Sequence, residues 1–281
     1  MRDGRLAERP PAPDRLPMPV VDNHGHLDVR RDDSPDVSLE QVIAEAAAVG
    51  VDRLVQIGCD LGSARWTVEA VDRHPALLGG VAIHPNEVPR HEAAGDLDAT
   101  FAEIAGLARH PRVRVVGETG LDYYRTGPDG VAVQQEWFRR HIALAKELGL
   151  ALQIHDRDAH DDVMRILAEE GAPDKTVLHC YSGDMTMARE CVRRGYYLSF
   201  AGTVTFRSAK DLRNALAVTP TEHLLVETDA PYLTPTPHRG RANAPYLVPL
   251  TVRVMAATLN TDVPRLCRAL SDNSEAVYGP W

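Results

Sequence analysis

Residues 20–28 read VVDNHGHLD and carry two histidines, His24 and His26, separated by a single glycine. Two β-branched residues followed by polar ones predict a short strand that ends in this pair. Because side chains at positions i and i+2 of a strand lie on one face, both imidazoles are expected to point toward the same place. Imidazole is the commonest neutral ligand for divalent transition metals. The stretch therefore predicts a first strand that ends at a metal site, with a polar strand end as the alternative.

Short apolar runs alternate with helical patterns along the rest of the chain. The predicted strands cover residues 19–23, 53–58, 78–83, 113–118, 151–155, 176–179, 196–200 and 224–228. The predicted helices cover residues 38–50, 63–74, 98–109, 131–148, 159–171, 184–194, 208–217 and 246–259, and two shorter helical segments end near Tyr278. Such alternation predicts right-handed βαβ units and a parallel sheet. Eight units in 281 residues favour an α/β fold of the (β/α)8 TIM-barrel type over an open doubly wound sheet.

A barrel brings the C-terminal ends of its strands to one mouth, where the chemistry takes place. Histidines and acidic residues recur where the predicted strands end, at His24, His26, His84, Glu118, His155, His179 and Asp229. Each of these residues, taken alone, is equally well explained as a hydrogen-bonded residue of the protein interior. Their recurrence at successive strand ends is what favours a functional site. Glu227 is predicted to lie deeper in the last strand, as a partner of the site or a satisfied interior carboxylate.

Four imidazoles and two carboxylates make the predicted ligand set. Its members are His24, His26, Glu118, His155, His179 and Asp229. This mixture is typical of zinc, manganese, cobalt or iron, and it exceeds the three protein ligands of a single catalytic zinc. Two ions about 3.5–4 Å apart need a bridging anion. Glu118, at the end of the fourth predicted strand, is the predicted bridge.

Composition sets broad limits on function. The chain is 44% hydrophobic and 25% charged, which is ordinary for a soluble globular protein, and no apolar run approaches a membrane span. A net charge of −9 argues against a protein that binds along nucleic acid by general electrostatic attraction. It does not argue against an enzyme that binds a few phosphates of its substrate. Residues 1–19 are predicted to be a disordered leader without a signal peptide, and residues 20–281 a single barrel domain. A cytoplasmic location is the default expectation. His141 is predicted to be solvated on a helix.

Six motifs in order resemble the TatD family of metal-dependent hydrolases, within the wider amidohydrolase-like barrels. They are DNHGHLD at 22–28, GVAIHP at 80–85, GETGLD at 117–122, IHDRDA at 154–159, LHCYSG at 178–183 and ETDAPYL at 227–233. The similarity spans residues 20–279. It implies that His24, His26, Glu118 and Asp229 hold one ion, and that Glu118, His155 and His179 surround the other.

The resemblance also implies an activity. Members of the family hydrolyse phosphodiester bonds, typically as 3′→5′ exonucleases on DNA and sometimes on RNA, and some relatives act on other esters, including misacylated transfer RNA. One departure is the loop at 239–245, which reads RGRANAP where the family usually has RGKRNEP. Ala242 and Ala244 therefore replace a basic and an acidic residue, which bears on how strongly phosphate is gripped.

Roles follow from this implied chemistry. Glu118 and Asp229 are the predicted catalytic residues, with Asp229 binding one ion and accepting the proton of the attacking water. His84, Arg157 and Arg239 are predicted to contact phosphate, and an ion pair with Asp122 or Asp158 is the alternative for Arg157. The cofactors expected are two divalent ions (zinc, magnesium or manganese). The expected partner is DNA, possibly RNA, as substrate, with no membrane and no obligate protein partner.

Two other functions remain open from the sequence. The altered loop and the acidic charge are compatible with a hydrolase of another ester, such as an aminoacyl ester or a small molecule, on the same metal site. A non-catalytic, metal-dependent binding protein is the third hypothesis.

Overall fold

The computed structural model describes residues 9–31 and 36–281, and their eight strands form one parallel sheet in the order β1 to β8. The strands are β1 (Val20–Gly25), β2 (Val51–Gly58), β3 (Leu77–Val81), β4 (Val113–Asp122), β5 (Ala151–Arg157), β6 (Thr176–Leu178), β7 (Tyr197–Phe200) and β8 (Leu224–Val226). Each strand pairs with the next along the chain. The predicted TIM barrel is therefore confirmed.

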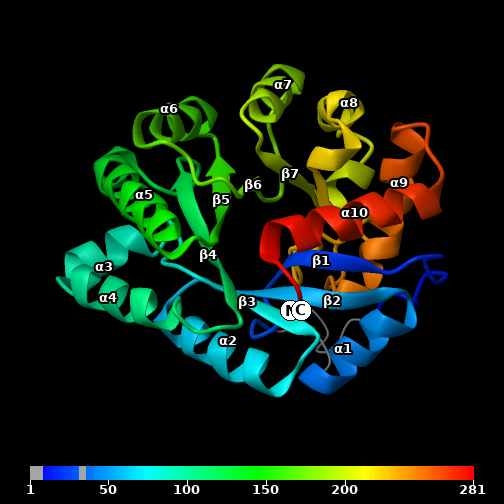
Figure 1. Ribbon diagram of the computed structural model, residues 1–281, viewed down its shortest axis with the longest axis horizontal. Coiled ribbons are helices and arrows are strands. Elements are labelled where there is room, and N and C mark those ends of the chain that lie inside the picture. Colours follow the sequence, from blue (N-terminus) through cyan, green and yellow to red (C-terminus); the bar gives the residue numbers. More distant parts are fainter. Residues whose placement is uncertain (1–8, 32–35) are drawn as a thin grey trace, which may run out of the picture.

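Helices connect successive strands and form an outer ring around them (Figure 1). They are α1 (Leu39–Ala48), α2 (Leu61–Arg73), α3 (Val88–Ala94), α4 (Leu97–Leu107), α5 (Pro128–Leu148), α6 (His160–Glu170), α7 (Met185–Arg193), α8 (Lys210–Val218), α9 (Val248–Thr258) and α10 (Val263–Tyr278). Three short 3-10 turns, Gly202–Thr205, Thr221–His223 and Pro245–Leu247, complete the list. Among the described residues, no helix is both long enough and apolar enough to cross a bilayer.

The end of the chain differs from the prediction, because α10 is one helix and not two short segments. Asp262 caps it by accepting a hydrogen bond from the amide of Arg265 at 2.7 Å. The polar run at 271–274 interrupts the apolar pattern, yet its last two residues are buried. Asn273 Nδ2 donates to the carbonyl of Leu224 at 2.8 Å, and Ser274 Oγ donates to that of Leu270 at 2.7 Å. Buried polar groups with partners are compatible with a continuous helix.

The described part of the leader is packed against the barrel, unlike the disorder predicted for it. Leu16 is only 2% exposed, and its amide donates to the carbonyl of Val49 at 2.9 Å. The hydroxyl of Tyr246 donates to the carbonyl of Pro10 at 2.7 Å. Residues 1–8 lie outside the described residues.

Side chains join β1 to β8 where the barrel closes. Asp22 accepts hydrogen bonds from the amide of Thr228 at 2.8 Å and from its hydroxyl at 2.5 Å. The amide of Asp229 donates to the carbonyl of His24 at 2.9 Å. The closure thus fixes the end of β8 relative to the histidine pair of β1.

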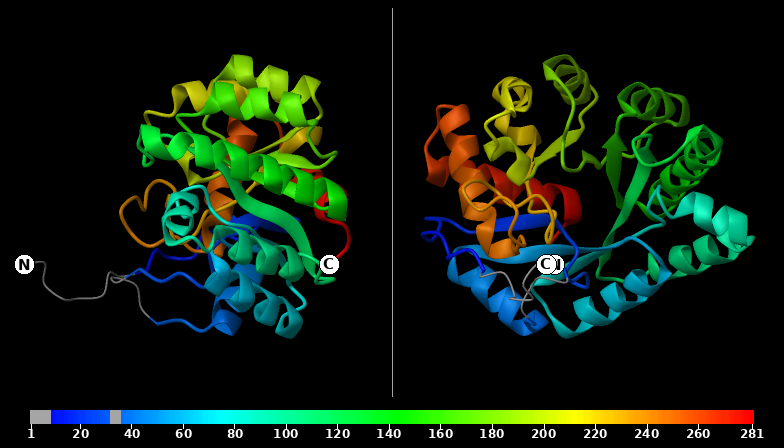
Figure 2. Two further views of the ribbon diagram at one scale, coloured as in Figure 1. Left: turned by 90° about the vertical axis from the view of Figure 1, so that its left-hand side faces the viewer. Right: turned by 180° about the vertical axis from the view of Figure 1, so that it is seen from behind.

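The C-terminus closes one end of the barrel. Tyr278, at the end of α10, packs with apolar side chains from seven strands: Val21, Val55, Leu78, Val115, Ala151, Val177 and Leu225. In the side view of Figure 2, the C-terminus lies at one end of the barrel and the orange loop after β8 lies at the other. The mouth formed by the strand ends is therefore the end that α10 leaves open.

Candidate metal centre

A β-bulge in β4 turns Glu118 into the barrel. Val116 pairs with Leu152 and Thr119 pairs with Ile154, so β4 has one more residue than β5 between these pairs. Bulges of this kind re-aim side chains beside active sites. A Cβ on Gly120, whose φ is +138°, would lie 2.1 Å from the carbonyl oxygen of His155, so only glycine fits there. The bulge leaves the Glu118 side chain 5% exposed.

His24 and His26 direct their Nε2 atoms toward each other at 3.3 Å. The Nδ1 atom of His24 donates to Gln153 Oε1 at 2.7 Å, and that of His26 donates to the carbonyl of Ile57 at 3.1 Å. Because a neutral imidazole carries one proton, both Nε2 atoms then present lone pairs. Two buried lone pairs facing each other repel, unless a cation or a proton lies between them.

His155 and His179 face the same carboxylate from another direction. Nδ1 of His155 lies 2.5 Å, and Nε2 of His179 lies 2.8 Å, from Glu118 Oε1. The other ring nitrogens are held by carboxylates, with His155 Nε2 3.2 Å from Asp122 Oδ2 and His179 Nδ1 3.1 Å from Glu227 Oε1. Metal-binding histidines almost always donate their second N–H to such a group.

The two oxygens of Glu118 serve two different sets of nitrogens. Oε2 lies 3.5 Å from His24 Nε2 and 3.7 Å from His26 Nε2. Oε1 faces His155 and His179 as above. Asp229 Oδ1 completes the first set, at 3.3 Å from His26 Nε2 and 3.9 Å from His24 Nε2. The six predicted ligands are thus brought together, with Glu118 between the two sets.

The donor set fits divalent metal ions. A tetrahedral zinc with bonds of about 2.0–2.1 Å separates its ligand atoms by about 3.3–3.4 Å. The distances among His24, His26, Glu118 and Asp229 range from 3.3 to 3.9 Å, close to that edge. The ligand atoms of His24, His26 and Glu118 all lie within 4.8 Å of one another. The residues present therefore fit an ion on this side of Glu118, and the imidazoles of His155 and His179 offer donors on the other.

Electrostatics within the cluster favour bound positive charge. Burial works to lower the pKa of His155, but the carboxylates of Glu118 and Asp122 outweigh it and raise that pKa to about 9. Burial also works to raise the pKa of Glu118, yet the surrounding histidines hold it well below its usual range. These shifts mean that the anionic cavity takes up protons when no other cation is present. A metal ion would replace those protons.

His84 lies in the same cluster but differs in how its ring is held. Its Nδ1 accepts a hydrogen bond from the amide of Asn86 at 3.0 Å, so the neutral ring carries its proton on Nε2. That Nε2 lies 3.4 Å from Glu118 Oε1. Burial lowers the pKa of His84, which favours this neutral form. The ring therefore presents a donor and not a lone pair, which suits contact with an oxygen better than metal ligation.

The two predicted phosphate-binding arginines are stacked on aromatic rings. The guanidinium carbon of Arg157 lies 4.0 Å from the ring centre of Tyr124, and that of Arg239 lies 4.1 Å from the ring centre of Phe206. No ion pair of Arg157 with Asp122 or Asp158 occurs in the described part of the chain. Arg239 is exposed and has no hydrogen bond to any of the six clustered residues within residues 9–31 and 36–281.

Three residues that contact the site were not predicted from the sequence. Asp122 and Gln153 hold His155 and His24, and Cys59 Sγ lies 3.5 Å from Glu118 Oε2. Cys59 follows β2, and its place at a strand end was the available signal. Gln153 is a polar residue in the interior of an apolar strand, which was the signal for an internal partner. Glu227, in contrast, was predicted as a partner of the site or as an interior carboxylate, and it pairs with His179.

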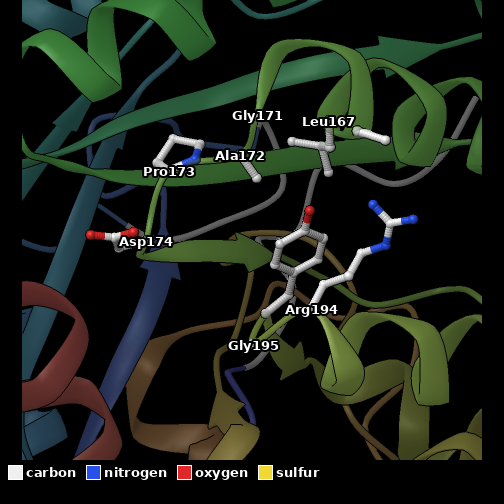
Figure 3. Close-up of a pocket in the computed structure, with 9 residues that line it drawn as sticks. Leu167, Gly171, Ala172, Pro173, Asp174, Arg194 and Gly195 are labelled. Atoms are coloured by element: carbon white, nitrogen blue, oxygen red, sulfur yellow. The ribbon is translucent and has the colours of Figure 1, made fainter.

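A hollow lies beside the segments that lead into β6 and β7 (Figure 3). It has a volume of about 410 Å³ and is lined by residues such as Pro173, Arg194 and Tyr196. These residues precede their strands, so the hollow lies at the end opposite the mouth. None of the predicted site residues lines it.

An eight-stranded parallel barrel with histidines and carboxylates gathered at its strand ends defines the class of metal-dependent barrel hydrolases. The family model for TatD related DNase matches residues 21–279. The chain therefore belongs to the TatD-related DNase family of metal-dependent hydrolases.

Two relatives agree with this membership, and a solved structure agrees with the fold. The chain is 46% identical over 264 residues to an uncharacterized metal-dependent hydrolase, TatD, of Mycobacterium tuberculosis, covering 92% of this chain and 98% of that protein. It is 35% identical to the uncharacterized metal-dependent hydrolase YabD of Bacillus subtilis, covering 92% and 98% respectively. The crystal structure of YjjV, a TatD homologue from Escherichia coli K12, superposes with a TM-score of 0.84 at 24% identity, over 93% of this chain and 98% of that one.

Proposed function

We propose that the protein is a phosphodiesterase that shortens DNA from its 3′ end, with Glu118 bridging two divalent ions. The observation that carries this proposal is the division of the Glu118 carboxylate, whose Oε2 faces His24 and His26 while its Oε1 faces His155 and His179. A pair of ions about 3.5–4 Å apart is the arrangement that suits in-line displacement at phosphorus. The family description adds DNA as the substrate class.

When bound, two divalent ions supply a water of lowered pKa and neutralise charge on the phosphoryl oxygens. The chain's own residues then perform the remaining tasks. Asp229 Oδ1 lies beside His26 with its side chain 14% exposed, so it is the carboxylate placed to accept the proton of the attacking water. The Nε2–H of His84 is placed to donate to a phosphate oxygen.

Arg157 contributes charge close to the centre. Its guanidinium carbon lies over the Tyr124 ring, and within residues 9–31 and 36–281 no ion pair uses its N–H groups, so they are available for two phosphate oxygens. Arg239 adds a second cation on the loop after β8, and the conformation of that loop decides whether its guanidinium contacts the substrate. Together they grip a few phosphates on a chain that carries a net charge of −9.

The test compares substrates at equal enzyme. Purified protein with Mn²⁺, Zn²⁺ or Mg²⁺ is given a 5′-labelled single-stranded DNA, the matching RNA, and a set of carbon esters and lactones. We expect stepwise 3′ shortening of DNA that a chelator abolishes. Asp229→Asn is expected to lower kcat by about 10²–10⁴-fold, because it removes the general base and one metal contact.

The matched control is Asp184→Asn, since Asp184 is an exposed carboxylate that caps α7 and an asparagine also caps helices. This variant is expected to keep wild-type activity. The proposal is wrong if no ion supports nucleotide release, or if carbon esters turn over faster than every phosphodiester. The second result would instead support an ester hydrolase that uses the same residues.

A further inference from the structure

Exposed large hydrophobic side chains gather at one end of the molecule. Among the described residues they are Val29, Tyr124, Met185 and Tyr232. All four follow the C-terminal end of a strand, on the segments after β1, β4, β6 and β8. Isolated exposed apolar residues are ordinary on a protein surface, so their shared end is informative only where one of them makes a further contact. That end carries the candidate metal centre.

Tyr124 has the largest exposed fraction of the four, at 66%, and it is backed by a cation. The guanidinium carbon of Arg157 lies 4.0 Å from its ring centre. The backbone fixes this pair, because Asp122 and Arg157 are register partners of β4 and β5 and the amide of Tyr123 donates to the carbonyl of Arg157 at 2.9 Å. Tyr124 thus offers an open aromatic face whose other side is held by an arginine.

The pair adjoins the candidate centre on the His155 side. Asp122, two residues before Tyr124, holds Nε2 of His155 at 3.2 Å, and Arg157 follows His155 by two residues. The Tyr124–Arg157 pair thus directly follows two strand ends that hold His155, on the side where the nucleotide that flanks a bound phosphodiester would lie.

Charge and shape together indicate which kind of ligand binds against the Tyr124 ring. Stacking on an aromatic side chain contributes to single-strand binding with any base, because every base has a π-face. An arginine against the ring adds a cation to this surface. A net charge of −9 limits the general attraction of the chain for the phosphate backbone, and stacking supplies affinity that does not depend on this attraction.

We propose that the Tyr124–Arg157 pair is a stacking platform for the base of a nucleotide that adjoins the scissile phosphate. The proposal rests on the proposed function and deepens it, since an unpaired base is required at that position. A base inside a duplex is covered by its neighbours and cannot lie on the ring. The platform therefore selects a single-stranded end without selecting a sequence.

The test uses abasic oligonucleotides. A strand of ten thymidines is compared with two strands that lack the base at the last or the penultimate nucleotide. Binding is measured by fluorescence anisotropy with Ca²⁺ in place of a catalytic ion, for the wild type, Tyr124→Phe, Tyr124→Ala and Met185→Ala. Met185 is the control, because it is 41% exposed at the same end but offers no ring.

We expect the wild type to bind the intact strand about tenfold more tightly than one of the two abasic strands. Tyr124→Phe and Met185→Ala are expected to keep this preference. Tyr124→Ala is expected to lose it by weakening the strands that keep the stacked base, while binding of the strand that lacks this base stays unchanged. In turnover, Tyr124→Ala is expected to raise KM with little change in kcat.

Equal binding of all three strands by the wild type, absence of binding, or a preference that survives in Tyr124→Ala would each overturn the platform. If DNA is cleaved but the preference is absent, the platform fails and the nuclease stands. If the preference is present but no phosphodiester is cleaved, the nuclease fails while the platform remains as a binding site.

Discussion

Each of the four histidines proposed as ligands uses one ring nitrogen to hold its orientation and leaves the other for the centre. The holding groups are Gln153, the carbonyl of Ile57, Asp122 and Glu227. The free nitrogen is Nε2 in three of the rings and Nδ1 in His155. This choice of nitrogen is set by the partner, since a neutral ring has a single proton.

Gln153 offers a direct test of that arrangement. Its amide is itself oriented, because Nε2 donates to the carbonyl of Asn23 at 2.8 Å and to the hydroxyl of Tyr278 at 2.7 Å. We expect Gln153→Leu to weaken metal binding about 10–100-fold, because the Nδ1–H of His24 loses its acceptor. Calorimetric titration of metal-free protein with Zn²⁺ or Mn²⁺ measures the change.

Asn273→Ala is the matched control, since it removes another buried amide that bonds two carbonyls, those of Thr221 and Leu224, away from the histidines. It is expected to lower stability by about 1–3 kcal/mol and to leave metal affinity unchanged. Wild-type affinity in Gln153→Leu would show that the orientation of His24 does not depend on this partner.

The positions of the strand ends were predictable from the sequence, but the bulges and contacts that bring their side chains together were not. The alternation of short apolar runs with helical patterns, and the recurrence of histidine and acidic residues, indicated a barrel with six clustered residues. The bulges that aim His24 and Glu118 add one residue to β1 and to β4, and nothing in the apolar pattern marks them. Partners such as Asp122 depend on pairing between strands that are distant in the sequence.

His141 on α5 shows the same limit for a helix. Its prediction as a solvated residue is wrong, because the side chain is fully buried. Its Nδ1 donates to the carbonyl of Trp137 at 2.7 Å, and its Nε2 accepts from the amide of Ile83 at 3.1 Å. Burial lowers its pKa to about 4, since protonation would set a second N–H against the amide of Ile83.

This shift predicts a pH dependence of stability. In the unfolded chain the ring takes up a proton near pH 6.5, whereas in the folded chain it stays neutral down to about pH 4. The unfolded state therefore binds more protons in this window, and stability falls as the pH falls from 6.5 to 4. The loss is about 3 kcal/mol at about 1.4 kcal/mol per pH unit.

The measurement is urea unfolding at several pH values with a chelator present, for the wild type and His141→Gln. Other groups titrate in both proteins, so the difference between the two curves isolates this residue. We expect that difference to change by about 3 kcal/mol between pH 7 and pH 4, with the variant losing less. A difference that stays constant with pH would contradict the account.

The two ends of the barrel have different roles, because one end is packed with apolar side chains and the other carries the reactive groups. Tyr278 and the apolar residues around it fill one end, while the other end carries the carboxylates, the imidazoles and the exposed tyrosines. The closed architecture was predictable because eight strand–helix units in order allow few other topologies. The packing of residues 9–19 on α1 and α9 was not predictable, because their proline-rich composition is also typical of a disordered segment.

Glu118 is the carboxylate proposed to join two ions inside this barrel. The most direct test is an anomalous difference map from crystals of the protein soaked or grown with Mn²⁺ or Zn²⁺. We expect two peaks about 3.5–4 Å apart, one beside each oxygen of Glu118, with Asp229 on the His24–His26 side. A single peak, or two peaks that do not share Glu118, would contradict it.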